Sequence, residues 1–180
     1  MTHTIIVENL RKIKKAVPLV ESRLKVKIKF GKGGQIFILG EEFNAFLVDK
    51  ILRAVDFGFD IEDAMLLRDD NFILEFVNMK EHTRRKNLED VRARMIGTDG
   101  KAKRTIEELS GCVIAISGNQ VGVIVNADHL DSVIQAIISL VQGAKHGNVF
   151  AYLEKQNAVR RSLDKDDLGL KIDDSEFEGV

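Results

Sequence analysis

The sequence predicts an α+β fold in which one order of strands and helices, β-α-α-β-β-α, occurs twice. Residues 26–30 alternate between apolar and charged side chains, which is typical of a half-buried strand, and residues 41–58 carry apolar side chains at helical spacing. Similar segments recur at an offset of 86 residues, so that Ile51–Leu52 aligns with Ile137–Ile138. A repeat of this length indicates two similar small domains rather than a solenoid. We therefore expect two three-stranded antiparallel sheets, each backed by helices, and a C-terminal helix.

The first domain is expected at residues 1–59. Its first strand is predicted at residues 4–7, and Asn9 can cap the helix that follows. Pro18 is expected to open a second helix, because proline is tolerated in the first turn of a helix. The next two strands form a hairpin around the glycine-rich turn Gly31–Gly34. These strands are predicted at 26–30 and 35–39, and the last helix at 41–58.

The second domain is expected at residues 71–145, and a short capped helix at residues 60–70 precedes it. This connecting helix either fastens the domains to each other or is an ordinary linker. A C-terminal helix at residues 146–163 follows, and the acidic residues 164–180 are expected to form a mobile tail. Within the second domain we expect strands at 71–77, 112–117 and 120–125 and helices at 88–96, 101–109 and 127–143.

A four-residue loop, Gly97-Thr98-Asp99-Gly100, separates two of these helices. Glycine has no Cβ, so a ligand can approach the main chain closely, and the loop can adopt dihedral angles that other residues avoid. The free amides and the dipole at the start of the next helix favour a negatively charged ligand. For the loop alone, the alternative is a helix C-cap followed by a turn. The apolar and basic residues on either side favour a phosphate-binding loop.

Basic residues surround this loop. Residues 80–104 contain nine basic and four acidic side chains, whereas residues 164–180 contain two basic and seven acidic ones, so the net charge of −1 conceals a basic body. Isolated charges usually form a solvated helix face, but these cluster beside a loop that can hold phosphates. Apolar residues on the next strand can support bases. The candidate RNA-binding residues are Gly97, Thr98, Asp99, Gly100, Lys101, Lys103, Arg104, Arg92, Arg94, Ile96, Ile114 and Ile116.

A Gly-x-x-Gly loop that clamps four backbone nucleotides is typical of the KH module. The string from Ile96 to Leu109, in which Gly-Thr-Asp-Gly is followed by Lys-Ala-Lys-Arg and Ile-Glu-Glu-Leu, resembles the two-KH-domain ribosome-assembly factors of archaea. These are relatives of the eukaryotic partner-of-Nob protein, also called the dimethylase-interacting protein, and of its KRR-motif sister. The resemblance covers residues 5–161 and implies two tandem type I KH domains. The first is a degenerate copy, because its helix junction at Lys14–Leu19 has no glycine.

The resemblance also implies a function. The family binds the 3′ region of small-subunit ribosomal RNA during assembly and cooperates with the endonuclease that trims this end and with an rRNA dimethylase. Two features depart from the family pattern. Thr98-Asp99 stands where many relatives have a basic residue, which lowers the expected affinity for phosphate, and the acidic tail is not expected of every member. The second domain is thus expected to bind single-stranded RNA, and the first to pack or to bind a protein.

Catalysis is not expected. The four histidines are scattered without the spacing of a metal site, and no Walker-type sequence follows a glycine loop. A turn before a strand explains Asp69-Asp70, and a buried inert thiol explains Cys112. We therefore expect neither a cofactor nor a bound metal.

No stretch of the chain approaches the length of a transmembrane helix, and the N-terminus has too short an apolar run for a secretory signal. A cytoplasmic protein that does not bind membranes is expected. Two hypotheses follow. The first is a non-catalytic RNA-binding factor in small-subunit assembly and rRNA 3′-end processing. The second is a protein-interaction scaffold with weak RNA affinity that recruits a nuclease, a methylase or an initiation-factor subunit.

Overall fold

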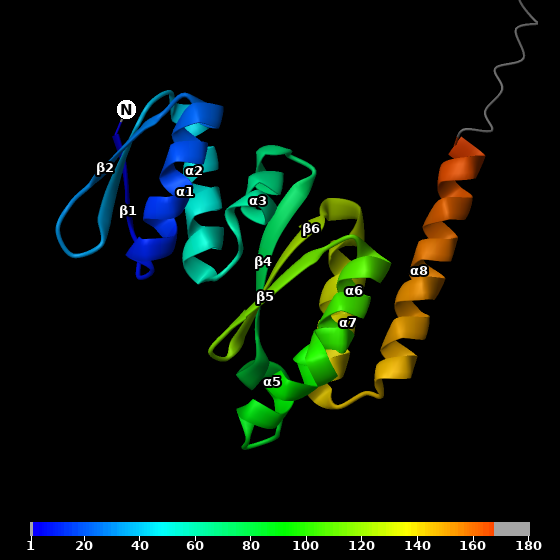
Figure 1. The fold of residues 1–180 in the computed structure, drawn as a ribbon. Coiled ribbons are helices and arrows are strands. Elements are labelled where there is room, and N and C mark those ends of the chain that lie inside the picture. The colour runs from blue at the N-terminus through cyan, green and yellow to red at the C-terminus, as the bar shows by residue number, and fades with distance from the viewer. Residues whose placement is uncertain (1, 168–180) are drawn as a thin grey trace, which may run out of the picture.

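The structure of the chain, a computed structural model, describes residues 2–167 and, within them, the side chains of residues 3–162. It consists of two units, each a three-stranded antiparallel sheet with helices on one face, followed by a long C-terminal helix (Figure 1). This is the α+β architecture that the sequence predicts. Residues 168–180, which include most of the expected mobile tail, lie outside the described residues.

The first unit has its hydrophobic core between one sheet and two helices. Its sheet has the strand order β1-β3-β2. Alternation places Ile28, Ile36 and Ile38 on the helix-facing side, where they are at most 8% exposed and belong to the same buried cluster as Ile13 and Val20. The elements are β1 (Thr2–Ile6), α1 (Leu10–Leu24), β2 (Lys27–Phe30), β3 (Gln35–Leu39) and α2 (Glu42–Phe57).

Helix α1 is continuous, whereas the sequence predicted two helices that meet at Pro18. A proline inside a helix removes one hydrogen bond and costs about 3 kcal/mol. Pro18 is exposed, so the carbonyl group of Lys14, which loses its partner, can bind water instead. The buried stripe continues across the proline with Val17 before it and Val20 after it. Because each buried valine contributes about 1.5–3 kcal/mol, the stripe outweighs the proline, and the first unit has the order β-α-β-β-α.

The second unit has the expected helix pair around the glycine loop. Its sheet order, β4-β6-β5, repeats that of the first unit. The predicted strands and helices are confirmed to within three residues, and the short helix α4 was not predicted. The elements are β4 (Phe72–Asn78), α4 (Met79–His82), α5 (Leu88–Ile96), α6 (Lys101–Ser110), β5 (Val113–Ser117), β6 (Gln120–Asn126) and α7 (Leu130–Gln142).

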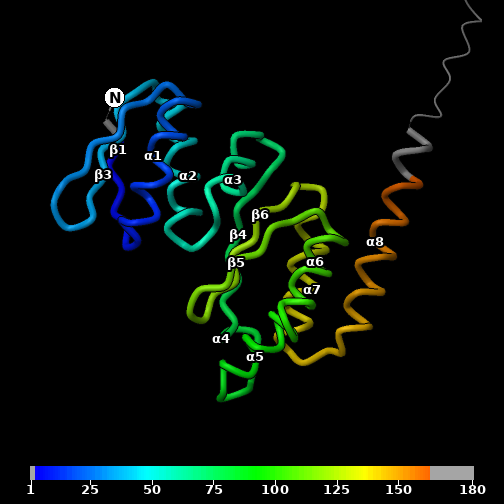
Figure 2. The backbone as a smooth tube through the Cα atoms, in the orientation of Figure 1, coloured from blue at the N-terminus to red at the C-terminus, as the bar shows by residue number. Residues whose placement is uncertain are grey.

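Two further segments flank the second unit. Helix α3 (Ile61–Ala64) and the 3₁₀ helix η1 (Met65–Arg68) connect it to the first unit. The C-terminal helix α8 (His146–Asp167) continues past residue 163, where the sequence predicted its end, and packs against α6 and α7 (Figure 2). The Asn157 amide donates to the Leu109 carbonyl at the end of α6. Within residues 2–167 we find no helix whose length and hydropathy would suffice to span a bilayer.

The outer face of the second sheet, which points away from its helices, packs against the first unit. The rings of Phe57 and Phe59 lie over Gly122 of β6, and the Phe57 ring also contacts Phe76, with centroids 4.8 Å apart. Ala64 of the connecting segment is fully buried in the same cluster. The connecting helix is therefore part of the contact between the units. The residues of the second sheet that join the core cluster of the first unit are Phe72, Leu74, Val113, Ala115 and Ile124.

Gly122 makes this contact testable. A Cβ at this position would lie 2.7 Å from Cε1 of Phe57, and that ring is packed between Phe59 and Phe76 and has little room to move. We expect Gly122→Ala to lower the free energy of unfolding by about 1–3 kcal/mol, measured by urea denaturation. The matched control is Gly147→Ala in α8, where the added methyl group meets open space. Equal urea midpoints for the two variants would contradict the close packing.

Candidate nucleic-acid interface

The corner between α5 and α6 can be formed only with glycine at its first position. Helix α5 ends at Gly97, whose amide donates to the Ala93 carbonyl at 2.8 Å, and its φ of 73° lies in the region that glycine favours. A Cβ at Gly97 would lie 2.6 Å from Cβ of Ala102. The two helices can therefore approach each other this closely only because position 97 has no side chain.

The rest of the loop is exposed and tightly turned. Thr98 and Asp99 are exposed, and Asp99 and Gly100 have φ values of 52° and 74°. The Arg104 guanidinium donates to the Asp99 carbonyl at 2.5 Å, which holds the loop against the first turn of α6. The loop therefore has the open, side-chain-poor form that the sequence predicted. Two of its amides are used within the corner, because Gly100 donates to the Gly97 carbonyl at 3.2 Å and Lys101 donates to the Thr98 carbonyl.

The three cations of α6 differ in their surroundings. Lys101 is exposed at the first helical position. Arg104 is engaged with the Asp99 carbonyl, and the ammonium group of Lys103 lies 3.1 Å from the Glu107 carboxylate. Lys101 is therefore best placed to meet a phosphate, and part of the charge of Lys103 is offset by Glu107.

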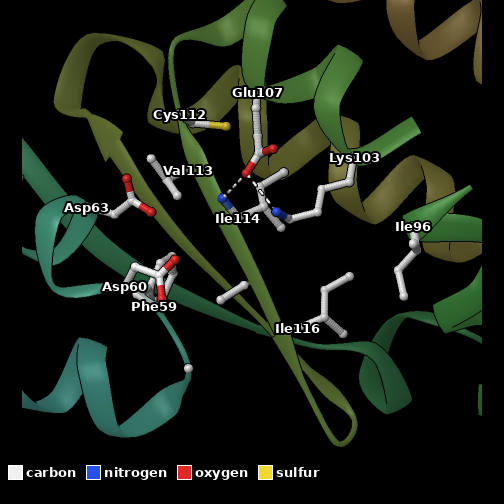
Figure 3. Close-up of a pocket in the computed structure, with 12 residues that line it drawn as sticks. Phe59, Asp60, Asp63, Ile96, Lys103, Glu107, Cys112, Val113, Ile114 and Ile116 are labelled. Carbon is white, nitrogen blue, oxygen red and sulfur yellow. Dashed lines mark hydrogen bonds and ion pairs between the residues drawn. The ribbon is translucent and has the colours of Figure 1, made fainter. Parts of the chain in front are cut away.

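A groove of about 640 Å³ begins at Ile96, the residue before this corner, and runs along the free edge of β5 (Figure 3). The exposed loop residues Thr98 and Asp99 line a separate hollow together with Lys101 and Arg104. Three of the candidate residues, Ile96, Ile114 and Ile116, line this groove. Ile114 is 2% exposed and belongs to the core, whereas Ile96 is 37% exposed. The other lining residues are Gly58, Phe59, Asp60, Asp63, Lys103, Glu107, Cys112, Val113 and Ala115.

Glu107 connects helix α6 to the edge strand. Its carboxylate accepts the Ile114 amide at 2.8 Å, in addition to pairing with Lys103. Because the Ile114 amide points away from β6, and backbone directions repeat every second residue, the amide and carbonyl groups of Ile116 also point into the groove. The backbone edge at Ile114 is thus occupied by Glu107, and the edge at Ile116 is directed into the groove.

The far end of the groove is acidic, which the sequence did not indicate. Asp60 and Asp63 of the connecting segment face Glu107 across the groove (Figure 3). Burial, and next the neighbouring carboxylates of Asp60 and Glu107, raise the pKa of Asp63 above its ordinary value. These two aspartates come from the segment between the units, so only the tertiary contact makes them part of the site.

Cys112 lies beside the groove as a buried thiol. Cys112 is 4% exposed, as expected for an inert thiol, and burial raises its pKa to about 11. Within residues 2–167, no group of three or more histidine, cysteine, aspartate or glutamate side chains is arranged to hold a metal ion.

Arg94, which the sequence predicted as an RNA-binding residue, is turned away from the groove. Its guanidinium points to the other side of α5 and donates to the carbonyls of Gly143, at 3.1 Å, and Ala144. These hydrogen bonds satisfy carbonyl groups directly after the end of α7, where helical partners are lacking. Arg92, in contrast, is one turn before Ile96 and so shares the face of α5 that lines the groove.

The first unit has no counterpart of this corner. Helix α1 ends at Lys25 and helix α6 ends at Gly111, and both residues have left-handed (αL) backbone dihedral angles. The two positions are 86 residues apart, which is the offset of the repeat. Helix α1 is therefore the equivalent of α6, and the first unit lacks an equivalent of α5, so the predicted helix junction at Lys14–Leu19 does not exist. The glycines of Gly31–Gly34 form a hairpin turn between β2 and β3, as the sequence predicted.

Comparison with known proteins identifies relatives of the second unit and of the whole architecture. Residues 73–158 match the family model of the second KH domain of PNO1, a eukaryotic-type KH domain (KH domain type I). The chain is 27% identical to a KH domain-containing protein of Methanocaldococcus jannaschii over 143 residues, which cover 76% of this chain and 63% of that protein. It is 32% identical to the pre-rRNA-processing protein pno1 of Aspergillus fumigatus over 111 residues, which cover 59% of this chain and 44% of that protein. The matches thus span less than two thirds of the length of these relatives.

The solved structures include two of Dim2p from Pyrococcus horikoshii. One is Dim2p itself, with a TM-score of 0.75 at 27% identity, covering 86% of this chain and 99% of that chain. The other is its complex with a/eIF2alpha and rRNA, with the same TM-score and identity, covering 87% of this chain and 93% of that chain. The similarity extends over both units.

The different surroundings of Arg92 and Arg94 predict different effects of the same substitution. Arg94→Gln is expected to lower the free energy of unfolding by about 1.5–3 kcal/mol, because it removes charge-assisted hydrogen bonds to helix-end carbonyls, and to leave the RNA affinity of the folded protein unchanged. Arg92→Gln is expected to change stability by less than about 0.5 kcal/mol and to weaken RNA binding severalfold. Denaturation and RNA titration of both variants test this. A loss of affinity with Arg94→Gln at full stability would contradict the assignment.

The raised pKa of Asp63 predicts a pH-dependent effect on stability. The folded protein binds the Asp63 proton more tightly than the unfolded chain, so stability falls as the pH rises from the ordinary value of 3.8 through the raised pKa, and ionised Asp63 destabilises the protein at neutral pH. Asp63→Asn should therefore stabilise the protein at neutral pH and much less at a pH below 3.8. Urea denaturation at both pH values measures this, with Asp70→Asn at an exposed turn as the control. Equal effects of Asp63→Asn at both pH values would be inconsistent with a raised pKa.

Proposed function

This chain is a homologue of the Pno1/Dim2 pre-rRNA-processing proteins of archaea and fungi, and from that premise we propose that it binds single-stranded RNA during assembly of the small ribosomal subunit. Its ligand is the 3′ region of the small-subunit rRNA, and it takes part in processing of this end without catalysing a reaction. The observation that carries the proposal is the exposed Gly97–Gly100 corner, together with the groove along β5 that begins at the preceding residue, Ile96. The rRNA complex of Pyrococcus Dim2p, which is similar over both units, supports it.

The corner holds the sugar-phosphate backbone. A phosphate beside Gly100 is attracted by the positive end of the α6 dipole. Lys101 adds a mobile charge, and Arg104 contributes its positive field while it stabilises the loop. Asp99 lowers the affinity because its exposed carboxylate stands in the loop itself. The site is therefore suited to moderate, salt-dependent binding.

The bases lie in the groove. The side chains of Ile96 and Ile116 offer apolar contact, and the backbone edge of Ile116 can pair with the edge of a base. Asp60 and Asp63 repel phosphate, so the RNA backbone remains on the side of the loop. A carboxylate at this end also accepts hydrogen bonds from exocyclic amino groups, as carboxylates do from cytosine.

The partners follow from the same proposal. A factor that holds the 3′ region of the rRNA would act beside the endonuclease that trims this end, an rRNA dimethylase or an initiation-factor subunit, and in the cytoplasm rather than at a membrane. The alternative, a protein scaffold with only weak RNA affinity, is less favoured, because the related Dim2p was solved together with rRNA.

The proposal predicts that the loop controls RNA affinity. The double substitution Thr98→Asp with Lys101→Asp places negative charge where the phosphates lie, so the affinity for a short single-stranded RNA from the 3′ end of small-subunit rRNA should fall at least about tenfold, or ~1.4 kcal/mol. Fluorescence anisotropy at several salt concentrations measures both the affinity and the number of phosphate contacts.

The control makes the same change in charge at an exposed place distant from the loop. Ser22→Asp with Lys15→Asp on α1 alters the net charge equally and should leave the affinity within about twofold. If the loop substitutions do not change the affinity, or if the control lowers it as much, the loop does not bind RNA and the proposal is wrong.

A further inference from the structure

The two ends of the groove along β5 carry opposite charges. Asp60 and Asp63 line the end where β5 begins, and Lys103 lies toward the glycine corner (Figure 3). Lys101 and Arg104 add positive charge in the hollow beside that corner. A ligand that matches this groove therefore has a positive group at the first end and negative groups at the second.

The part of the chain that follows α8 has this order of charges. Helix α8 ends at Asp167, and residues 168–180, the C-terminal segment, lie outside the described residues. The sequence of this segment begins with apolar side chains at every second position, at Leu168, Leu170 and Ile172. Lys171 stands between the last two, and four acidic residues follow within the next six positions. Alternation of this kind is typical of a chain that pairs with a sheet edge.

Helix α8 brings the C-terminal segment close to the acidic end of the groove. Arg160 and Arg161 of α8 line a pocket together with Gly111, which ends α6 just before β5. From Arg161 to Asp167 the helix rises about 9 Å, and the path from Gly111 to Ile116 along β5 is about 17 Å. An extended chain of thirteen residues spans up to about 43 Å. The C-terminal segment is therefore long enough to return to the start of β5 and to follow the groove to the corner.

The groove offers a partner for each part of the C-terminal segment. The backbone edge of Ile116 is directed into the groove, so an extended chain can pair with it as a further strand, and Ile96 offers apolar contact. A segment that enters at the start of β5 brings Lys171 beside the two aspartates and its acidic residues beside Lys103. Burial, and next repulsion among neighbouring carboxylates, raise the pKa of Asp63, and a lysine at this place offsets that repulsion.

We propose that the C-terminal segment occupies the groove of its own chain and competes there with single-stranded RNA. Because RNA binding in this groove is the proposed function, the competition rests on it, whereas docking of the segment does not. A segment joined to the domain acts at a high local concentration, so weak pairing is sufficient to occupy the groove. RNA then binds only the molecules whose groove is open, and the measured affinity is lower than that of the open groove.

Substitutions in the full chain separate docking from the general field of the acidic residues. Lys171→Glu makes the chain more negative, which by the field alone weakens RNA binding. In the docked segment the same change sets a carboxylate against the two aspartates, so the segment should leave the groove and the affinity for a short single-stranded rRNA fragment should rise about fivefold. Leu170→Ser with Ile172→Ser keeps the charge and should raise the affinity similarly. The matched control is Lys155→Glu at an exposed position of α8, which should not raise the affinity.

Docking is measured without RNA from the backbone amide resonances of the ¹⁵N-labelled full chain. The amide of Ile116 should change its chemical shift between the parent protein and the variant Leu170→Ser with Ile172→Ser, because the segment no longer pairs with this edge. The amide of Gly33, in the hairpin of the first unit, serves as the reference and should keep its shift.

Three outcomes would overturn the inference. If Lys171→Glu lowers the affinity as Lys155→Glu does, the charges act only through the general field. If the Ile116 amide has the same shift in the parent protein and the serine variant, the segment stays in solvent. If the difference in shift grows with protein concentration, the segment occupies the groove of a second copy. Absence of RNA binding in every version, with a response of the Ile116 amide, would instead contradict the proposed function and leave the docking in place.

Discussion

One hydrogen bond determines the geometry of the groove, and both units contain it. The carboxylate of Glu107 accepts the amide of Ile114, at the free edge of the sheet, and 86 residues earlier that of Glu21 accepts the amide of Ile28 at 2.7 Å. A bond between a carboxylate and a backbone amide contributes about 1.5–3 kcal/mol. It ties the helix that begins at the glycine loop to the strand that forms the floor of the groove. The distance between the glycine corner and the edge strand is therefore set by the second unit itself.

The contact between the units then closes the far end of that groove. Because position 122 has no side chain, Phe57 and Phe59 can lie flat on the second sheet, and the segment after them brings Asp60 and Asp63 opposite Glu107. The candidate site consequently combines cations of the second unit with carboxylates that come largely from the connecting segment. In the proposed function, phosphates are attracted to the cations and repelled from the carboxylates.

The two repeats have the same order of strands and the same edge hydrogen bond, but they differ in their helices and in the outer face of the sheet. The second has kept the helix pair and its loop, and the outer face of its sheet is used for packing. The first has a single helix in place of the pair, and its outer face remains free and carries lysines on β2.

Periodicity, glycine positions and the repeat offset were sufficient to predict both sheets, the α5–loop–α6 corner and the apolar floor at Ile114 and Ile116, because these depend on neighbours close in the sequence. Continuity of α1 through Pro18 could not be predicted, since it depends on which side of the helix is buried. The same holds for Arg94, whose partners at Gly143 and Ala144 lie about fifty residues away, and for Asp60 and Asp63, which reach the groove only through the packing of the units. The sequence by itself determined the local elements and the loop that can hold phosphate. Only the tertiary structure decided which charges face that loop, because side chains distant in the chain meet only when the two units pack together.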